Sequence, residues 1–529
     1  MRQLTISACV DEVPCVYPVG SERPMSIALL LDMAQGGSLA DPDLTAIVSG
    51  ELRLSVAELS ALADGGAGVV AVSGAEHVAY VGTGGAMLPL LLFASARAAV
   101  PFTPLNYRLS AENLRTLIGR LPEPLVVVDD EYRDAVGDCG RQVITSAEFL
   151  NAARTGDPLA DAAGPDPDAV AVVLFTSGTT SAPKAVELSH NNLTSYIMGT
   201  VDFDSAEPGD ASLICVPPYH IAGVSAALSN LYAGRRMVYL TAFDAGEWVR
   251  LVDGESVTSA TVVPTMLDRI VTELEAASST LPTLRSLAYG GSKVALPLVR
   301  KALRLLPDVG FVNAYGLTET SSTIAVLTPD DHRVAFSSEH PDVVRRLGSV
   351  GRPVPTIEVQ IRGEDGTVLG PNETGELFVR GEQVSGRYTG IGSVLDDEGW
   401  FPTKDVAYLD ADGYLFIGGR SDDTIIRGGE NIAPAEIEDV LVEHPDVHEC
   451  AVVGVEDPSW GQIIVAVVVP AAGSTPDVEA VREFVRSQLR GSRTPDRVVF
   501  REELPANATG KVLRRDLVRE LNESVKEPV

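Results

Sequence analysis

Hydroxyl side chains and a lysine are concentrated in one short segment, Thr176–His190, with the sequence TSGTTSAPKAVELSH. The segment offers hydroxyls, a glycine backbone and an ammonium group that together can surround an anion: Thr176, Ser177, Gly178, Thr179, Thr180 and Lys184. It does not follow the GxxxxGK(S/T) pattern of the P-loop. A bare TSG is equally typical of an ordinary polar turn, but the length of this pattern favours a phosphate-binding loop of another kind.

The segment follows an apolar run, AVAVVLF, and similar short runs recur through the first three-quarters of the chain. Helix-length stretches of mixed polarity separate them, which is typical of parallel strands joined by crossover helices. Small and hydroxyl residues follow several runs, as in TSGTT, YGGSK and NAYGLTET. Since ligands bind beyond the carboxyl ends of parallel strands, these segments are expected at a binding site.

The sequence changes character from about Ile357, where short β-prone runs alternate with Gly, Asp and Asn. This pattern predicts antiparallel strands joined by turns. Beyond Arg420, helical segments alternate with β-branched runs in a smaller unit. We therefore predict an α/β protein in which residues 1–421 form a large N-terminal domain with mixed and parallel sheets, helices and a β subdomain. Residues 422–529 are predicted to form a small α+β C-terminal domain.

The bulk composition fits a globular enzyme and argues against some partners. The chain has 529 residues, is 45% apolar and carries a formal net charge of −32. Binding to nucleic acid or to an anionic membrane requires basic surfaces, so neither partner is expected. The most apolar segment, Ala86–Val100, contains Pro89 and Arg97 and is too short to span a bilayer. We expect it to be a buried helix, and no integral membrane association.

The cysteines and the N-terminal residues indicate a cytoplasmic protein. The five cysteines are scattered, without a CxxC pair: Cys9, Cys15, Cys139, Cys215 and Cys450. An odd, scattered set fits a reducing compartment better than a disulfide framework or a zinc site. Asp11 and Glu12 interrupt the N-terminal segment, so no signal peptide is expected.

A series of segments resembles the adenylate-forming superfamily, which includes acyl-CoA synthetases, luciferases and adenylation domains. TSGTTSAPKAVELSH resembles the phosphate loop of that superfamily, usually written TSGTTGxPKGxxxSH. Further matching segments follow in the family's order: PPYHIAG, YGGSK, NAYGLTET, GWFPTKD, GRSDDTIIRGGENIAPAEIE and LPANATGKVLRR. One such motif would be weak, but the ordered set covers roughly Ile27–Leu521, nearly the whole chain.

The resemblance implies an enzyme that activates a carboxylic acid with ATP, giving an acyl-adenylate and pyrophosphate. Two anions must then approach each other, so cations and fixed donors are needed around the developing charge. By resemblance, Glu319 would hold Mg²⁺, Thr318 would bond the α-phosphate, and Lys511 would bridge this phosphate and the attacking carboxylate. The TSGTT loop would hold the β- and γ-phosphates.

The resemblance also implies the contacts to adenosine. Asp405, helped by Arg420, would accept from the ribose hydroxyls, and Tyr315 would stack on adenine. Further residues of the implied nucleotide site are Gly290, Gly291, Ser292, Asn313 and Gly316.

A second half-reaction is implied by the hinge motif. In the family, the small C-terminal domain is mobile and swings about the position that matches Asp422, which removes the lysine and presents the loop Arg427–Asn431. Gly428 and Gly429 would then line a narrow tunnel for the pantetheine of CoA or of a carrier protein. His220 would gate the approach of the thiol, although a pocket histidine without that role fits nearly as well.

Three residues depart from the family pattern: Ser181, Ala185 and Lys404 replace glycines. The first two add a Cβ, which costs little unless φ is positive, so we expect a functional but less mobile loop. Lys404 places a cation beside Asp405, where it is expected either to pair with Asp405 or a phosphate, or to point into solvent.

The motifs indicate the acid substrate and the thiol acceptor less closely than they indicate the nucleotide site. PPYHIAGV contains no acidic residue that would pair with an α-ammonium group, which argues against an amino acid. The expected lining is apolar and suits a fatty or aromatic acid: Tyr219, His220, Val263, Met266, Ala288, Gly290 and Ala314. The ordinary length of Gly351–Gly381 favours CoA as acceptor over a carrier protein.

A function of a different class stays open, a non-catalytic sensor of acyl or nucleotide ligands. Such a protein is expected to lack Glu319, Asp405 or Lys511, and all three are present.

Overall fold

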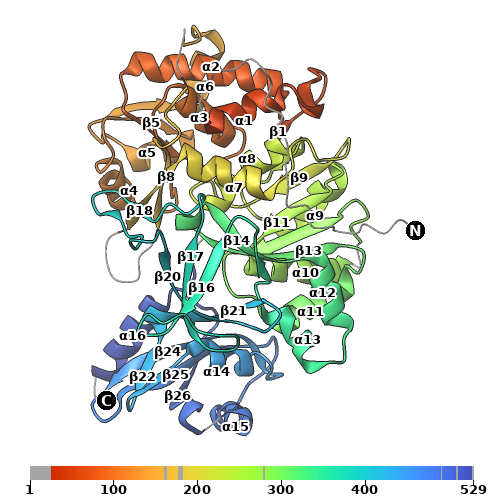
Figure 1. Ribbon diagram of the computed structural model, residues 1–529, viewed down its shortest axis with the longest axis vertical. Helices are drawn as coiled ribbons and strands as arrows, with labels where there is room; N and C mark the ends of the chain where they lie inside the picture. The colour runs from red at the N-terminus through yellow and green to blue at the C-terminus, as the bar shows by residue number, and fades with distance from the viewer. Residues whose placement is uncertain are drawn as a thin grey trace.

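The computed structural model describes residues 25–159, 164–176, 183–277, 280–489, 491–507 and 510–526. Within these residues the chain forms four β-sheets, three in the larger N-terminal part and one in the C-terminal part (Figure 1). The mixed α/β architecture with a large and a small domain is as predicted.

The largest sheet has nine strands in the described residues. In spatial order they are β15 (Arg352–Pro353), β14 (Ser322–Leu327), β13 (Gly310–Leu317), β12 (Ser286–Gly290), β11 (Ser259–Val262), β9 (Ala211–Ile214), β10 (Arg236–Tyr239), β1 (Ile47–Ser49) and β2 (Leu52–Leu54). The strands from β13 to β1 pair in parallel, and antiparallel strands close both edges.

A second sheet of eight described strands lies to the left of it in Figure 1. Its order is β19 (Gly392–Ser393), β18 (Arg387–Tyr388), β8 (Lys184–Ser189), β7 (Val170–Thr176), β4 (Phe102–Leu105), β3 (His77–Val81), β5 (Pro124–Val128) and β6 (Gln142–Thr145). The apolar runs HVAYV, PLVVV and AVAVVLF form β3, β5 and β7, in the parallel part of this sheet, as their pattern predicted.

Helices connect and cover these sheets. They are α1 (Ile27–Ala34), α2 (Val56–Ser73), α3 (Met87–Arg97), α4 (Ala111–Ile118), α5 (Arg133–Val136), α6 (Ser146–Thr155), α7 (His190–Thr200), α8 (Ile221–Tyr232), α9 (Ala245–Gly254), α10 (Pro264–Ala277), α11 (Leu296–Leu305), α12 (Pro329–Ser337) and α13 (Pro341–Arg345). One hydrophobic core joins strands of both sheets to α1, α3, α7 and α8. The segment Ala86–Val100 forms the buried helix α3, as predicted.

One described helix, α2, is long and apolar enough to cross a membrane by length and composition. Within the fold, 56% of that stretch is buried against other parts of the protein. It packs on α3 and α6. A core helix of this kind passes the same test, so α2 is weak support for a membrane span.

The β subdomain and the C-terminal domain follow the predicted pattern. The subdomain is an antiparallel sheet of β16 (Glu358–Arg362), β17 (Gly375–Arg380), β20 (Phe401–Leu409) and β21 (Leu415–Arg420). The C-terminal sheet contains β23 (Glu430–Ile432), β22 (Ile425–Arg427), β25 (Gly461–Pro470), β24 (Val447–Asp457) and β26 (Arg497–Phe500), packed with α14 (Pro434–Leu441), α15 (Val478–Gln488) and α16 (Arg514–Lys526). Its first strand begins shortly after the predicted boundary near Asp422, and that boundary remains a prediction.

Candidate active site

A buried carboxylate at the edge of the β subdomain is fixed by two neighbours. Asp405 on β20 is only 5% exposed and pairs across the ladder with Arg420, the last residue of β21. The Arg420 guanidinium lies 3.2 Å from Oδ1 of Asp405, and the Tyr315 hydroxyl donates to Oδ2. Burial raises the pKa of Asp405, while Arg420 and Tyr315 oppose this shift. The cluster therefore holds an oriented acceptor where β13 of the large sheet meets β20 and β21.

Lys511 reaches this cluster from the C-terminal domain. Although part of the residue is exposed, its pKa is lowered, first by the protein atoms around its ammonium group and then by the charge of Arg420. Asp405 acts in the opposite direction. The preceding Gly510 packs so closely on α10 that an added Cβ would lie 2.4 Å from Oγ1 of Thr265. The lysine loop therefore rests on the large domain beside the buried carboxylate.

His220 also lies close enough to Lys511 to sense its charge. It forms the N-cap of α8, where its Nδ1 accepts from the backbone N–H of Ala222 at 3.2 Å. Burial, and then the charge of Lys511, lower the pKa of His220 to about 4. A neutral imidazole at neutral pH leaves the positive charges of this group on Lys511 and Arg420.

Glu319 lies in a 3₁₀ turn that directly follows β13, Thr318–Thr320. Its backbone carbonyl accepts from the N–H of Ser385, and its Oε1 accepts from the Tyr388 hydroxyl at 2.9 Å. The Tyr388 ring also lies 5.4 Å from Nζ of Lys184, measured to the ring centroid. Tyr388 thus connects the predicted magnesium ligand with the lysine of the predicted phosphate loop.

Sequence reasoning missed Tyr388. It is one aromatic residue in a glycine-rich segment, GRYTGIG, which by itself is typical of an exposed turn. Only the pairing of β18 with β8, which places Tyr388 opposite Val186, brings its side chain to the site.

The predicted phosphate loop is described only at its two ends. Thr176 ends β7 and donates to the carbonyl of Lys184 at 3.4 Å, and Lys184 begins β8 with an exposed side chain. The remaining predicted residues of the loop lie outside the described residues: Ser177, Gly178, Thr179 and Thr180, together with the variant Ser181.

The residues predicted to surround adenine lie at the carboxyl ends of β12 and β13. An added Cβ at Gly290 would lie 2.1 Å from the carbonyl oxygen of Ala314 on the paired strand, so the close approach of β12 and β13 requires glycine there. Asn313 donates through Nδ2 to the carbonyl of Ser349 at 3.2 Å. Gly291, Ser292 and Gly316 lie on the same edge, and the contacts of this set to a nucleotide remain predictions.

The two tunnel glycines lie in the C-terminal domain, in the turn between β22 and β23. Gly428 and Gly429 have φ values of +58° and +86°, which L side chains rarely adopt. An added Cβ at Gly428 would lie 3.0 Å from the ring of Trp460, whose side chain is exposed. Their predicted role beside pantetheine remains a prediction.

Two of the departures from the family pattern are explained by the fold. Lys404 has φ +66°, a left-handed conformation that glycine adopts without steric cost. Its Nζ lies 3.2 Å from Oε1 of Glu376, so the ion pair that we observe is to this residue. Ala185 lies within strand β8 and is buried.

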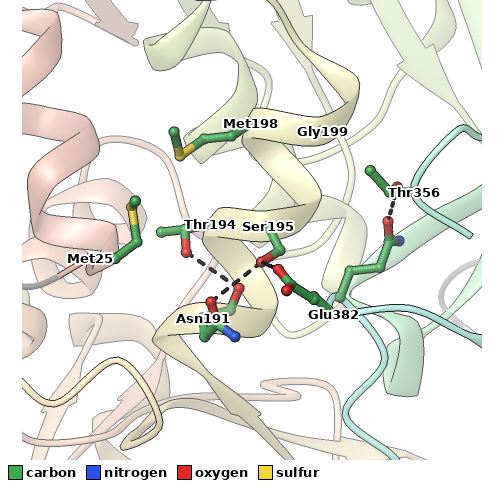
Figure 2. A pocket seen from close by; sticks show the side chains of 9 residues that line it. Met25, Asn191, Thr194, Ser195, Met198, Gly199, Thr356 and Glu382 are labelled. Carbon is green, nitrogen blue, oxygen red and sulfur yellow. Dashed lines mark hydrogen bonds between the residues drawn. The ribbon is translucent and has the colours of Figure 1, made fainter. Parts of the chain in front are cut away.

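A cavity of about 470 Å³ lies outside the Asp405 cluster, between α7 and the segment around Glu382 (Figure 2). Ser195 donates to Glu382 at 3.2 Å across it, and Thr356 donates to Gln383 at 2.9 Å. The amide of Gln383 in turn donates to the carbonyl of Thr320, at 3.0 Å. The cavity therefore lies behind the Glu319 turn and does not contain the predicted site residues.

Known proteins share this architecture and chain length. The AMP-binding enzyme family matches residues 38–389, and the AMP-binding enzyme C-terminal domain matches residues 436–511. An indoleacetate–CoA ligase of Aromatoleum aromaticum is 35% identical over 91% of this chain and 96% of its own. The fatty acid–[acyl-carrier-protein] ligase ScoC of Streptomyces coeruleorubidus is 32% identical over 84% of this chain and 86% of its own.

A solved structure agrees with these matches. ATP-bound MatB from Rhodopseudomonas palustris has a TM-score of 0.84 and 27% identity, covering 95% of this chain and all of that one. The chain therefore belongs to the AMP-binding enzyme family, within the adenylate-forming superfamily, as its motifs indicated. The relatives found include ligases whose names give CoA or an acyl carrier protein as the acceptor.

Proposed function

We propose that this enzyme converts an alkyl or aromatic carboxylic acid into its CoA thioester through an acyl-adenylate. One observation carries the proposal: the loop of Lys511 packs on Thr265 of α10, where the Lys511 ammonium is close enough to interact electrostatically with Asp405, Arg420 and His220. An ammonium beside a buried carboxylate and a guanidinium matches what adenylation requires, because it offers a cation between two anions that must meet.

In the first half-reaction, a carboxylate oxygen of the acid forms a bond to the α-phosphorus of ATP. The bond from that phosphorus to the bridging oxygen breaks, and pyrophosphate leaves with the electron pair. Lys511 neutralises the approaching carboxylate and the α-phosphate, and Thr318 donates to the phosphate. Asp405 accepts from the ribose hydroxyls while Arg420 and Tyr315 keep it in place.

The residues present fit a magnesium ion that binds together with the substrate phosphates. Among the described residues no group of three or more His, Cys, Asp or Glu side chains forms a preassembled metal site. Mg²⁺ in such enzymes is held by one or two carboxylates together with substrate phosphates. Glu319, oriented by Tyr388, supplies one hard oxygen for that purpose. When bound, the ion supplies positive charge that stabilises the departing pyrophosphate.

In the second half-reaction, the thiol of CoA attacks the carbonyl carbon of the acyl-adenylate, and AMP leaves. Rotation of the C-terminal domain about Asp422 would bring Gly428 and Gly429 to the pantetheine. The neutral imidazole of His220, at the start of α8, would gate the approach of the thiol.

The pocket residues support an apolar acid. Val263 and Met266 are buried beside β11 and α10, and the segment Pro217–Gly223 contains no acidic residue. A carrier protein is the second candidate for the acceptor, because the relative ScoC is a fatty acid–[acyl-carrier-protein] ligase. Against a non-catalytic sensor stand the three residues that such a protein would lack, Glu319, Asp405 and Lys511. We also propose a cytoplasmic location, which the free thiols of Cys139, Cys215 and Cys450 support.

Carboxylate-dependent ATP–pyrophosphate exchange over a panel of alkyl and aromatic acids tests this proposal. We expect exchange with at least one acid, loss of exchange in Lys511→Ala, and an acyl-CoA mass when CoA is added. Exchange without thioester formation would contradict CoA as acceptor, and transfer to a carrier protein would then support the second candidate. No exchange with any acid would favour the sensor.

A further inference from the structure

Lys511 depends on a short hairpin for its position. The backbones of Ala506 and Val512 pair across it, and the carbonyl of Lys511 accepts from the N–H of Asn507 at 2.9 Å. The Lys511 N–H donates to Oδ1 of Asn507, also at 2.9 Å. These contacts join the two arms of the hairpin, but they do not fix where the arms lie relative to the rest of the C-terminal domain.

Arg514, at the start of α16, connects the hairpin to the rest of that domain. Its guanidinium makes a bidentate contact with the carboxylate of Glu438 on α14, at 2.5 and 3.0 Å. We call this Arg514–Glu438 contact the fork. The same group donates to the carbonyl of Val452 on β24 at 2.8 Å, and its Nε lies 3.6 Å from Asp423 beside the predicted hinge. Three separate elements therefore meet at one side chain.

The geometry of this contact requires arginine. The Glu438 side chain is only 12% exposed, and its Oε1 also accepts from the N–H of Val452 at 2.6 Å. A planar guanidinium satisfies both carboxylate oxygens at a fixed angle, whereas a lysine ammonium binds as a single point charge. The fork therefore sets the orientation of α16, and with it the hairpin, relative to α14.

The next residue on α14 extends the connection to the large domain. Asp439 pairs with Lys293 at 2.6 Å, and Lys293 directly follows the Gly290–Ser292 turn. On the other side of the hairpin, Gly510 packs on Thr265 of α10. A continuous path thus runs from the predicted adenine edge, through α14 and Arg514, to the catalytic lysine.

We propose that Arg514 is a positioning residue for adenylation, which holds the Lys511 ammonium beside Asp405 by fixing its hairpin to Glu438. This inference rests on the proposed function. The proposed role of Arg514 predicts different effects on the two half-reactions, because Lys511 serves only the first of them. Loss of the fork should slow formation of the acyl-adenylate and leave its conversion to the thioester intact.

The test compares Arg514→Gln, Arg514→Lys and Glu438→Gln with wild type in each half-reaction. ATP–pyrophosphate exchange reports the first, and thioester formation from supplied acyl-adenylate and CoA reports the second. We expect the kcat of exchange to fall by roughly a hundredfold, since a displacement of about 1 Å can cost that much, with little change in the KM for ATP. Arg514→Lys retains the charge without the fork and should recover only part of the loss.

Arg501→Gln is the matched control, because Arg501 joins the same helix α16 to the sheet through Glu520 at 2.7 Å. It should leave both half-reactions near wild type. Equal losses in the two half-reactions, together with a lower Tm, would show a merely structural role and overturn the proposal. Unchanged exchange in all three variants would overturn it as well.

A measurement without turnover distinguishes a failure of this inference from a failure of the proposed function. Burial lowers the pKa of Lys511 most, the charge of Arg420 lowers it next, and Arg514 adds a smaller effect in the same direction. Acetylation of Lys511 by acetic anhydride, followed by mass spectrometry over a pH series, should therefore show a higher midpoint in Arg514→Gln than in wild type and in Arg501→Gln. An unchanged midpoint would contradict the positioning role even if no acid substrate supported exchange.

Discussion

The backbone of Lys404 shows how one substitution follows from local geometry. Its φ of +66° lies in the region that glycine occupies at no steric cost. The Lys404 carbonyl accepts from the Ser421 hydroxyl at 3.2 Å, so this conformation adjoins the predicted hinge. The side chain pairs with Glu376 at the protein surface, where an ion pair contributes about 1 kcal/mol or less.

Replacing Lys404 by glycine and by alanine separates the two effects. Both variants lose the ion pair, but only glycine relieves the strained φ. We expect Lys404→Gly to be more stable than Lys404→Ala by about 1 kcal/mol, measured by urea unfolding. The KM for ATP should not change in either variant, and a higher KM in both would instead support a contact between Lys404 and the nucleotide.

The Tyr388 hydroxyl donates a hydrogen bond to the carboxylate of Glu319. A hydrogen bond to a charged group is worth about 1.5 kcal/mol or more, so Tyr388→Phe should slow ATP–pyrophosphate exchange by about tenfold. The loss should be larger at low Mg²⁺ concentration if Glu319 holds the ion. Tyr408→Phe is the control, because Tyr408 stacks on Phe416 in the β subdomain. Equal activity of the two variants would contradict the role of Tyr388.

At the scale of elements, the strands β12 and β13 determine the shape of the predicted adenine edge. They pair from Ser286 with Gly310 to Gly290 with Ala314, and the turns that carry the candidate residues leave from their carboxyl ends. The spacing at this end is set by the missing side chain at Gly290. The same glycine therefore serves packing and access to the site.

A Gly290→Ala variant should disturb the packing of β12 on β13 and the binding of ATP. The added methyl group would lie 2.1 Å from the Ala314 carbonyl oxygen, so the strands must separate. We expect a loss of about 1–3 kcal/mol in the free energy of unfolding, as for other overpacked sites, and a higher KM for ATP. Gly254→Ala at the end of α9, where nothing lies within 4 Å of the added Cβ, should be close to neutral. Wild-type stability of Gly290→Ala would contradict the packing argument.

At the scale of the whole molecule, an ion pair and a histidine–carboxylate contact among the described residues link the domains in the arrangement that places Lys511 near the site. Lys293 pairs with Asp439 at 2.6 Å, and His448 approaches Asp268 at 3.9 Å. These contacts are partly exposed, so each contributes little on its own. Such weak contacts suit the proposed rotation of the C-terminal domain between the two half-reactions.

The stability of the large domain should depend on pH through its buried histidines, among them His77 and His190. Burial lowers the pKa values of His77 and His190 to about 4, from an ordinary 6.5. The unfolded chain therefore binds more protons between these values, and stability falls as the pH drops from 6.5 towards 4. Each histidine contributes a slope of at most about 1.4 kcal/mol per pH unit.

Urea unfolding between pH 7 and pH 5 measures this slope. His77→Gln should make the loss of stability on acidification smaller, because one titrating group has been removed. His340→Gln is the control, since this histidine is 68% exposed. An identical slope in His77→Gln and wild type would contradict the assignment.

The fold class and the class of chemistry could both be predicted from the sequence alone. Apolar runs placed β3, β5, β7 and β12, because the period and composition of a strand are local properties. The ordered motifs picked out Glu319, Asp405, Arg420 and Lys511, since motif residues are recognised without knowing what they touch, and the roles of these residues remain predictions.

Only the tertiary structure decided which of these residues meet. Tyr388 reaches Glu319 through the pairing of β18 with β8, and Arg514 finds Glu438 across the packing of α16, β24 and α14. Lys404 carries its strain in a φ angle that its sequence neighbours do not reveal. Contacts between distant segments depend on how sheets and helices pack, and no local pattern of residues contains that information.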